Sequence, residues 1–151
     1  MDFINKIFEF ELATMVPDMA QVLEKVRLAV TVAVLLGPVF LLILGLIYFF
    51  IPPKEANHRL GFRTYFGMGS VDAWQFTQKV AGIAFGGLGL ILLVVMLVTI
   101  SGFDGMDHFQ MVTKAMTCML WQAALALLAR LTTVVIVTLR YNKNGDRRNQ
   151  K

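Results

Sequence analysis

Three long apolar runs constrain this chain more than any other feature of its sequence. They cover about residues 28–50, 80–100 and 115–139, and Arg130 is the one charged residue within them. A helix of about 20 apolar residues crosses a hydrocarbon core of about 30 Å. Only helices and closed barrels satisfy their backbone in lipid, and these runs are continuous rather than alternating. We therefore predict an all-α integral membrane protein with three transmembrane helices.

Composition supports this fold class. The chain of 151 residues is 57% hydrophobic and 16% charged, whereas a soluble domain is about a quarter charged. We expect one transmembrane domain, residues 28–139, and no second globular core. Within the first run, Gly37-Pro38 predicts a kink, and Pro52-Pro53 follows its end.

The segment before the first run is amphipathic. Apolar residues recur at helical spacing over residues 2–12, with polar residues on the other face. We predict a short helix in the membrane interface there, and a helical lead-in over residues 17–27. The alternative is that the N-terminal helix binds a partner. The domain division is then an N-terminal segment 1–27, the transmembrane domain with a loop at 51–79, and a basic tail at 140–151.

Basic residues predict the orientation. With three spans, the N-terminus shares a side with the second loop, and the first loop shares a side with the tail. The first pair of segments holds four Lys and Arg residues and the second pair holds nine. The side with more basic residues is usually cytosolic. We therefore expect the first loop and the C-terminus in the cytosol of a plasma-membrane protein, the N-terminus outside, and no nucleic acid bound by the tail.

The first loop holds the least generic residues of the chain. Gly61 permits a positive φ or close approach of another segment. Ser70 is placed to cap a helix that begins at Val71. Trp74 and Gln78 then lie one turn apart on one face of that helix. The distinctive residues of this loop are Asn57, Gly61, Phe62, Arg63, Thr64, Ser70, Trp74 and Gln78.

In this order, after a proline-ended span, these residues resemble the signature of the SdpI/YhfL family. The resemblance covers about half of the chain. It implies a bacterial plasma-membrane protein of an immunity type that protects a cell against a secreted antimicrobial peptide. Separately, no metal-binding or cofactor-binding motif occurs, so we expect neither a metal nor a cofactor. The family's named member also recruits a cytosolic repressor, but it is longer and has further spans. Phe62 stands where the family more often has tyrosine, so we carry over immunity rather than signalling.

Polar and small residues inside the spans offer further candidates. A charge at the centre of a span is costly and indicates function by default, so Arg130 has a structural, a ligand-binding or a lipid-anchoring role. Gln122, Arg130 and Thr133 form a polar stripe that we expect to face the bundle or a partner. Gly82 and Gly86 have the spacing of close helix packing, within the chain or in a homo-oligomer.

The sequence leaves more than one function open. No catalytic motif occurs, so we do not expect an enzyme. Immunity is the first hypothesis, and a small transporter or channel subunit or an accessory subunit of a membrane complex are the alternatives. The expected partners are the lipid bilayer, a peptide toxin or its target, a cytosolic protein at the first loop, and a second copy of the chain.

Overall fold

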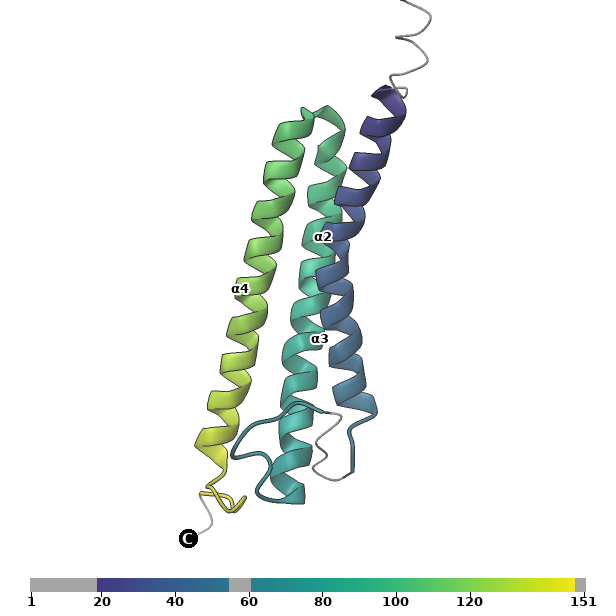
Figure 1. The fold of residues 1–151 in the computed structure, drawn as a ribbon. Helices are drawn as coiled ribbons and strands as arrows, with labels where there is room; N and C mark the ends of the chain where they lie inside the picture. The colour runs from purple at the N-terminus through teal and green to yellow at the C-terminus, as the bar shows by residue number, and fades with distance from the viewer. Residues whose placement is uncertain (1–18, 55–60, 149–151) are drawn as a thin grey trace, which may run out of the picture.

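A computed structural model describes residues 19–54 and 61–148. Its helices are α2 (Met19–Phe50), α3 (Val71–Ser101), the short 3-10 helix η1 (Gly102–Gly105) and α4 (His108–Arg140) (Figure 1). The helix predicted over residues 2–12 lies outside the described residues, and so does Asn57.

The three transmembrane helices are confirmed, and each is longer than the apolar run that predicted it. α2, α3 and α4 are all long and apolar enough to cross a membrane. α2 includes most of the predicted lead-in, and α4 begins seven residues before the predicted span. Hydrocarbon thickness limits the apolar run but not the helix, which continues into the polar headgroup region. The chain is a multi-pass membrane protein.

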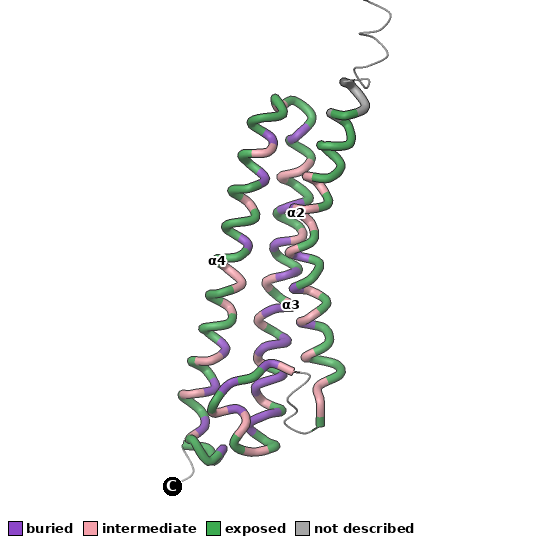
Figure 2. The backbone as a smooth tube through the Cα atoms, viewed as in Figure 1, coloured by how far each residue is buried: buried purple, intermediate pink, exposed green. Residues whose placement is uncertain are grey.

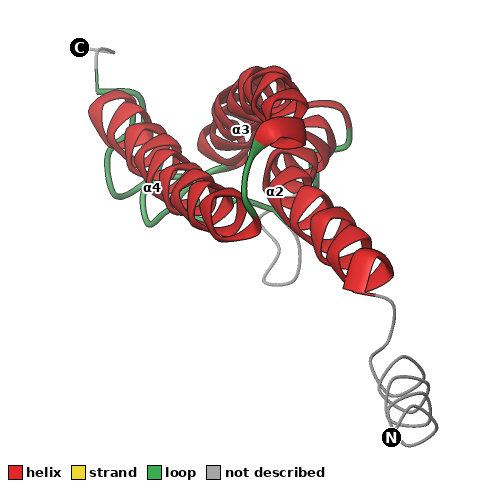
Figure 3. Ribbon diagram, turned by 90° about the horizontal axis from the view of Figure 1, so that it is seen from above, coloured by secondary structure: helices red, strands yellow, loops and turns green. Residues whose placement is uncertain are grey.

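α3 is the central helix of the bundle. α2 and α4 run in the same direction, and α3 runs between them in the opposite direction (Figure 1). The interface of α2 with α3 is the most extensive, and α4 makes fewer contacts with either helix. Seen from above, α2 and α4 flank α3 and diverge from each other (Figure 3). Many large apolar side chains of all three helices are exposed, as expected of a surface that faces lipid. Figure 2 shows exposed residues along the length of each helix.

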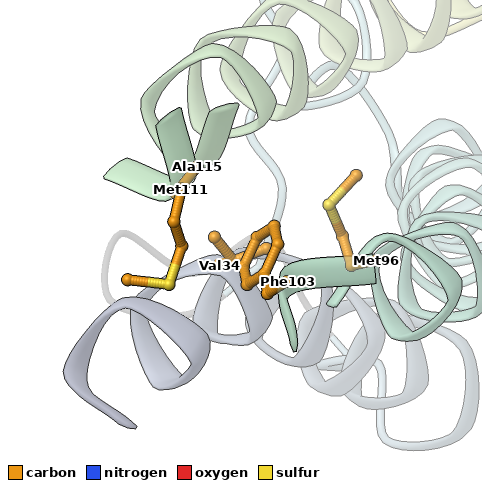
Figure 4. Close-up of a cluster of buried hydrophobic side chains, with 5 residues drawn as sticks. All are labelled: Val34, Met96, Phe103, Met111 and Ala115. Atoms are coloured by element: carbon orange, nitrogen blue, oxygen red, sulfur yellow. The ribbon is translucent and has the colours of Figure 1, made fainter. Parts of the chain in front are cut away.

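Two clusters of buried side chains hold the bundle together. The first lies near the η1 end and joins α2, α3, η1 and α4 (Figure 4). Its members are Val34, Met96, Phe103, Met111 and Ala115. At the same end, Arg27 of α2 forms an ion pair with Asp104 of η1. The second cluster lies towards the other end and takes in one loop residue. Its members are Leu41, Phe62, Ala81, Phe85 and Leu92.

Glycines bring the backbones of α2 and α3 together. A Cβ added at Gly45 would collide with the backbone of Gly86. A Cβ at Gly89 would lie 2.5 Å from the backbone nitrogen of Leu42, and one at Gly82 would lie 2.8 Å from that of Phe49. The glycine spacing in α3 therefore serves a contact within the chain.

Candidate functional site

Gln78 of α3 fixes the backbone of the first loop. Its Oε1 accepts a hydrogen bond from the Phe62 N–H, and its Nε2 donates one to the Phe62 carbonyl, each at 2.8 Å. The Gln78 side chain is fully buried. A buried amide must be paired to avoid a desolvation cost, and this arrangement satisfies both sides. The Phe62 ring can therefore pack at the bundle end, where it meets Tyr48 and Phe85.

Trp74 closes the loop from the other side. It is fully buried, and its indole Nε1–H donates to the Pro53 carbonyl at 2.8 Å. Gly61 lies against this ring, with φ at +107°. A Cβ at Gly61 would lie 2.6 Å from Trp74 Cζ2. Gly61 is needed for its backbone conformation and also for the space that the indole occupies.

Thr64 begins a turn that packs against α3. Its Oγ1 accepts from the Gly67 N–H at 2.9 Å. A Cβ at Gly67 would collide with the Thr77 hydroxyl, and that hydroxyl donates to the Ala73 carbonyl at 2.7 Å. Ser70 then caps α3 by accepting from the Ala73 N–H at 3.1 Å, which is the helix start that the sequence predicts.

Arg63 and Tyr65 of the first loop face outwards. Phe62 and Thr64 are buried. Arg63, which lies between them, is exposed, and so is Tyr65, which follows Thr64 and has 74% of its surface accessible. The buried side chains hold the backbone, so the positions of Arg63 and Tyr65 are set by the fold. Of the distinctive residues of the loop that the structure describes, Arg63 is the charged one, and it is exposed.

The segment after α4 is folded against the first loop. Tyr141 is buried and its ring packs on Phe76, with 5.6 Å between centroids. Asn142 Oδ1 accepts from the N–H groups of Asn144 and Asp146 at 2.9 Å and shapes a turn. Gly145, at φ +81°, accepts a hydrogen bond from the Ser70 hydroxyl at 2.8 Å.

The sequence predicts only a basic tail at residues 140–151, whereas residues 141–148 are folded, with an isolated β-bridge between Tyr141 and Arg147. Asparagine and glycine favour turns, so Asn142 and Gly145 are a sequence signal that predicts this turn. Two arginines of this tail also have structural contacts. The Arg140 guanidinium lies 4.4 Å from the centre of the Phe76 ring, and Arg148 Nε donates to the Tyr141 carbonyl at 3.2 Å.

Inside the membrane, Gln122 supplies a hydrogen bond that α2 lacks. α2 continues through Pro38, which has no N–H, so the Val34 carbonyl has no donor four residues on. Gln122 Nε2 of α4 donates to that carbonyl at 3.0 Å. Gly37 leaves the space, because a Cβ there would collide with Gln122 Oε1. The glycine, the proline and the glutamine are one contact between α2 and α4.

The predicted polar stripe of α4 does not stay together. Gln122 and Thr133 are buried, whereas Arg130 is exposed. Thr133 donates to the Ala129 carbonyl within its own helix at 2.9 Å. Eleven residues return a helix almost to the same face, but eight residues turn it by about 80°. Arg130 therefore faces away from the bundle interior.

Comparison with known proteins identifies the family. A family model described as the SdpI/YfhL protein family matches residues 54–141. The chain belongs to this family. The match runs from the first loop through α3 and α4 to Tyr141, and so includes Gln78, Trp74 and the loop that they hold. No curated protein and no solved structure matches the chain. At the level of the family, the chain is a membrane immunity-type protein.

Proposed function

We propose that this protein lies in a bacterial plasma membrane and protects its cell against a secreted antimicrobial peptide. The observation that carries the proposal is the match to the SdpI/YfhL family over the first loop and the two helices that follow. The buried contacts of Gln78 and Trp74 support it, because they keep the matched loop in one conformation.

We further propose that the first loop and the C-terminus face the cytosol. The two segments are in contact through Ser70 and Gly145, so they share one end of the bundle. Of the described residues, seven at this end are basic, and three at the other end are. The positive-inside rule favours the cytosol for the more basic end. Those seven are Lys54, Arg63, Lys79, Arg140, Lys143, Arg147 and Arg148.

The residues that would meet a peptide, its target or a soluble partner are Arg63 and Tyr65. Both are exposed, and both stand on a backbone fixed by buried neighbours. Phe62, Thr64, Trp74 and other buried residues of the loop would then serve function indirectly, by holding these two in place.

The test is protection of a sensitive bacterium that expresses the protein. The cells are challenged with the peptides encoded beside the gene. We expect survival with the wild-type chain and loss of protection when Arg63 and Tyr65 are both changed to alanine. Lys143→Ala, an exposed charge at the same end, is the matched control and should protect. Sensitivity to every peptide, with wild-type protein present in the membrane, would refute the proposal.

A second candidate, an accessory subunit that holds a soluble protein, is favoured by the same exposed pair. It predicts that a soluble protein is recovered with the wild-type chain and lost with Arg63→Ala. Recovery that is the same with Arg63→Ala and with wild type would remove this candidate.

A further inference from the structure

An apolar groove opens between α2 and α4. It has a volume of about 470 Å³, within the range of sites for small ligands. Leu36 and Phe40 of α2 line one wall, and Met119, Ala123 and Ala126 of α4 line the other. Gln122 is the one lining residue with a polar side chain, and its Nε2 is already bonded to Val34. The groove therefore fits a hydrocarbon chain better than a polar ligand.

Arg130 lies beyond the residues that line this groove, on the side of the basic end of α4. It is four residues after Ala126 and so lies one turn further along the same face of α4. The side chain is exposed, and within the described residues it forms no ion pair.

The groove and the charge have a definite order along the membrane normal. Arg130 is ten residues before Arg140, or about 15 Å from the end of α4. Residues 119–126 are deeper still. A molecule with its anion at Arg130 and its chain in the groove would point its head towards the basic end of the bundle and its tail towards the bilayer centre. This is the orientation of a lipid in the leaflet at that end.

Charge supports an anionic lipid in particular. At this end, the described residues include seven basic side chains and two acidic ones, Asp72 and Asp146. Basic pockets between transmembrane helices bind anionic headgroups. A second copy of the chain is a poorer occupant, because it would bring another Arg130, and the predicted spans hold no acid to pair with it.

We propose that the groove between α2 and α4 is a binding site for one anionic phospholipid. The phosphate binds Arg130, whose long side chain extends towards the headgroup level. One acyl chain lies along Ala126, Ala123 and Phe40. The site would bind lipid whether or not a peptide is present. The lipid proposal and the proposed immunity function can therefore be tested separately.

The test compares phosphatidylglycerol with phosphatidylcholine of the same acyl chains. The full chain in mild detergent is titrated with each lipid, and bound lipids are counted by native mass spectrometry. We expect phosphatidylglycerol to bind about fivefold more tightly, because that is the contribution of one basic residue near an anionic lipid. Arg130→Gln should abolish this preference. Ala123→Trp should fill the groove and reduce binding of both lipids.

Two controls are matched to these variants. Lys114→Gln removes an exposed charge of the same sign at the opposite end of α4, and Ala124→Trp adds the same ring to α4 one residue away, outside the groove lining. Both should keep wild-type binding and preference. All four positions are exposed, and helix content by circular dichroism establishes that each variant is folded.

Several results would overturn the proposal. One is equal binding of the two lipids by the wild type, and another is a preference that survives Arg130→Gln. A dimer that Ala123→Trp dissociates would assign the groove to a second copy. A transmembrane partner that co-purifies only while Arg130 is present, with no lipid preference, would assign it to another protein.

Discussion

The side-chain amides of two glutamines form hydrogen bonds with backbone groups that lack a backbone partner. Gln78 pairs with both the N–H and the carbonyl of Phe62, and Gln122 supplies the donor that Pro38 removes from α2. Both side chains are buried. Where water is absent, a backbone group without a partner costs several kcal/mol. Each glutamine therefore joins a distant segment to the bundle by satisfying its backbone.

We predict that the stabilising effect of Gln122 depends on Pro38. Gln122→Leu leaves the Val34 carbonyl without a donor and should cost about 1–3 kcal/mol. In a Pro38→Ala background, the new amide at residue 38 can bond to Val34, so the same change should cost less. Unfolding of the four proteins in mixed micelles measures this coupling. An equal cost of Gln122→Leu in both backgrounds would contradict the role assigned to Gln122.

At the scale of the elements, the pairing of α2 with α3 depends on where small residues meet. The spacing of Gly82 and Gly86 indicates a packing face on α3, but the tightest point of the contact is Gly45 on α2. A Cβ at Gly86 would lie 3.6 Å from Gly45 Cα, which is ordinary contact, whereas one at Gly45 has no room. Gly45 and Gly86 therefore differ in the space that each has for a Cβ.

This asymmetry gives a prediction. Gly45→Ala should force the two helices apart and lower stability by about 1–3 kcal/mol, as over-packing does. Gly86→Ala and Gly87→Ala should be near neutral, because the first is in normal contact and the second has open space. Thermal unfolding in detergent separates the three variants. Equal destabilisation by Gly45→Ala and Gly86→Ala would show that the interface adjusts and that the close contact is not limiting.

At the scale of the whole molecule, the two connections at the basic end form one unit. The loop before α3 and the segment after α4 meet at Ser70 and Gly145, 75 residues apart in the chain. Tyr141 and Phe76 add an aromatic contact beside this hydrogen bond. α2 and α4 diverge from each other (Figure 3). The first cluster of buried side chains joins all three helices at the η1 end, and this unit joins the loop to the C-terminal segment at the other end.

We predict that Gly145→Val releases the first loop. A Cβ at Gly145 would lie 2.5 Å from the backbone of Gly69 and Ser70, and valine disfavours a φ of +81°. Such strain costs about 1–3 kcal/mol, so cleavage by trypsin after Arg63 should become about tenfold faster. Gly105→Val, at a glycine with open space, is the control. Unchanged cleavage after Arg63 would mean that the C-terminal segment does not hold the loop.

Local chemistry explains why much of this protein is predictable from its sequence. The number of helices follows from the length of the apolar runs, because lipid allows no other way to satisfy the backbone. The start of α3 follows from Ser70, since an N-cap is a contact between residues three apart. Gly61 and the shared face of Trp74 and Gln78 are local too. The part that these residues play in holding the loop became clear only from their partners.

Tertiary structure decided what depends on segments far apart in the chain. The bond from Gln122 to Val34 joins residues 88 positions apart, and no local pattern identifies such a pair. The exposure of Arg130 depends on which face of α4 packs against α3, and a helix that is apolar nearly all round does not indicate that face. By itself, the sequence determined that three helices cross the membrane and where α3 begins, because these depend on lipid and on neighbouring residues. The position of each polar side chain was decided by helix packing, which follows from shape complementarity over the whole bundle.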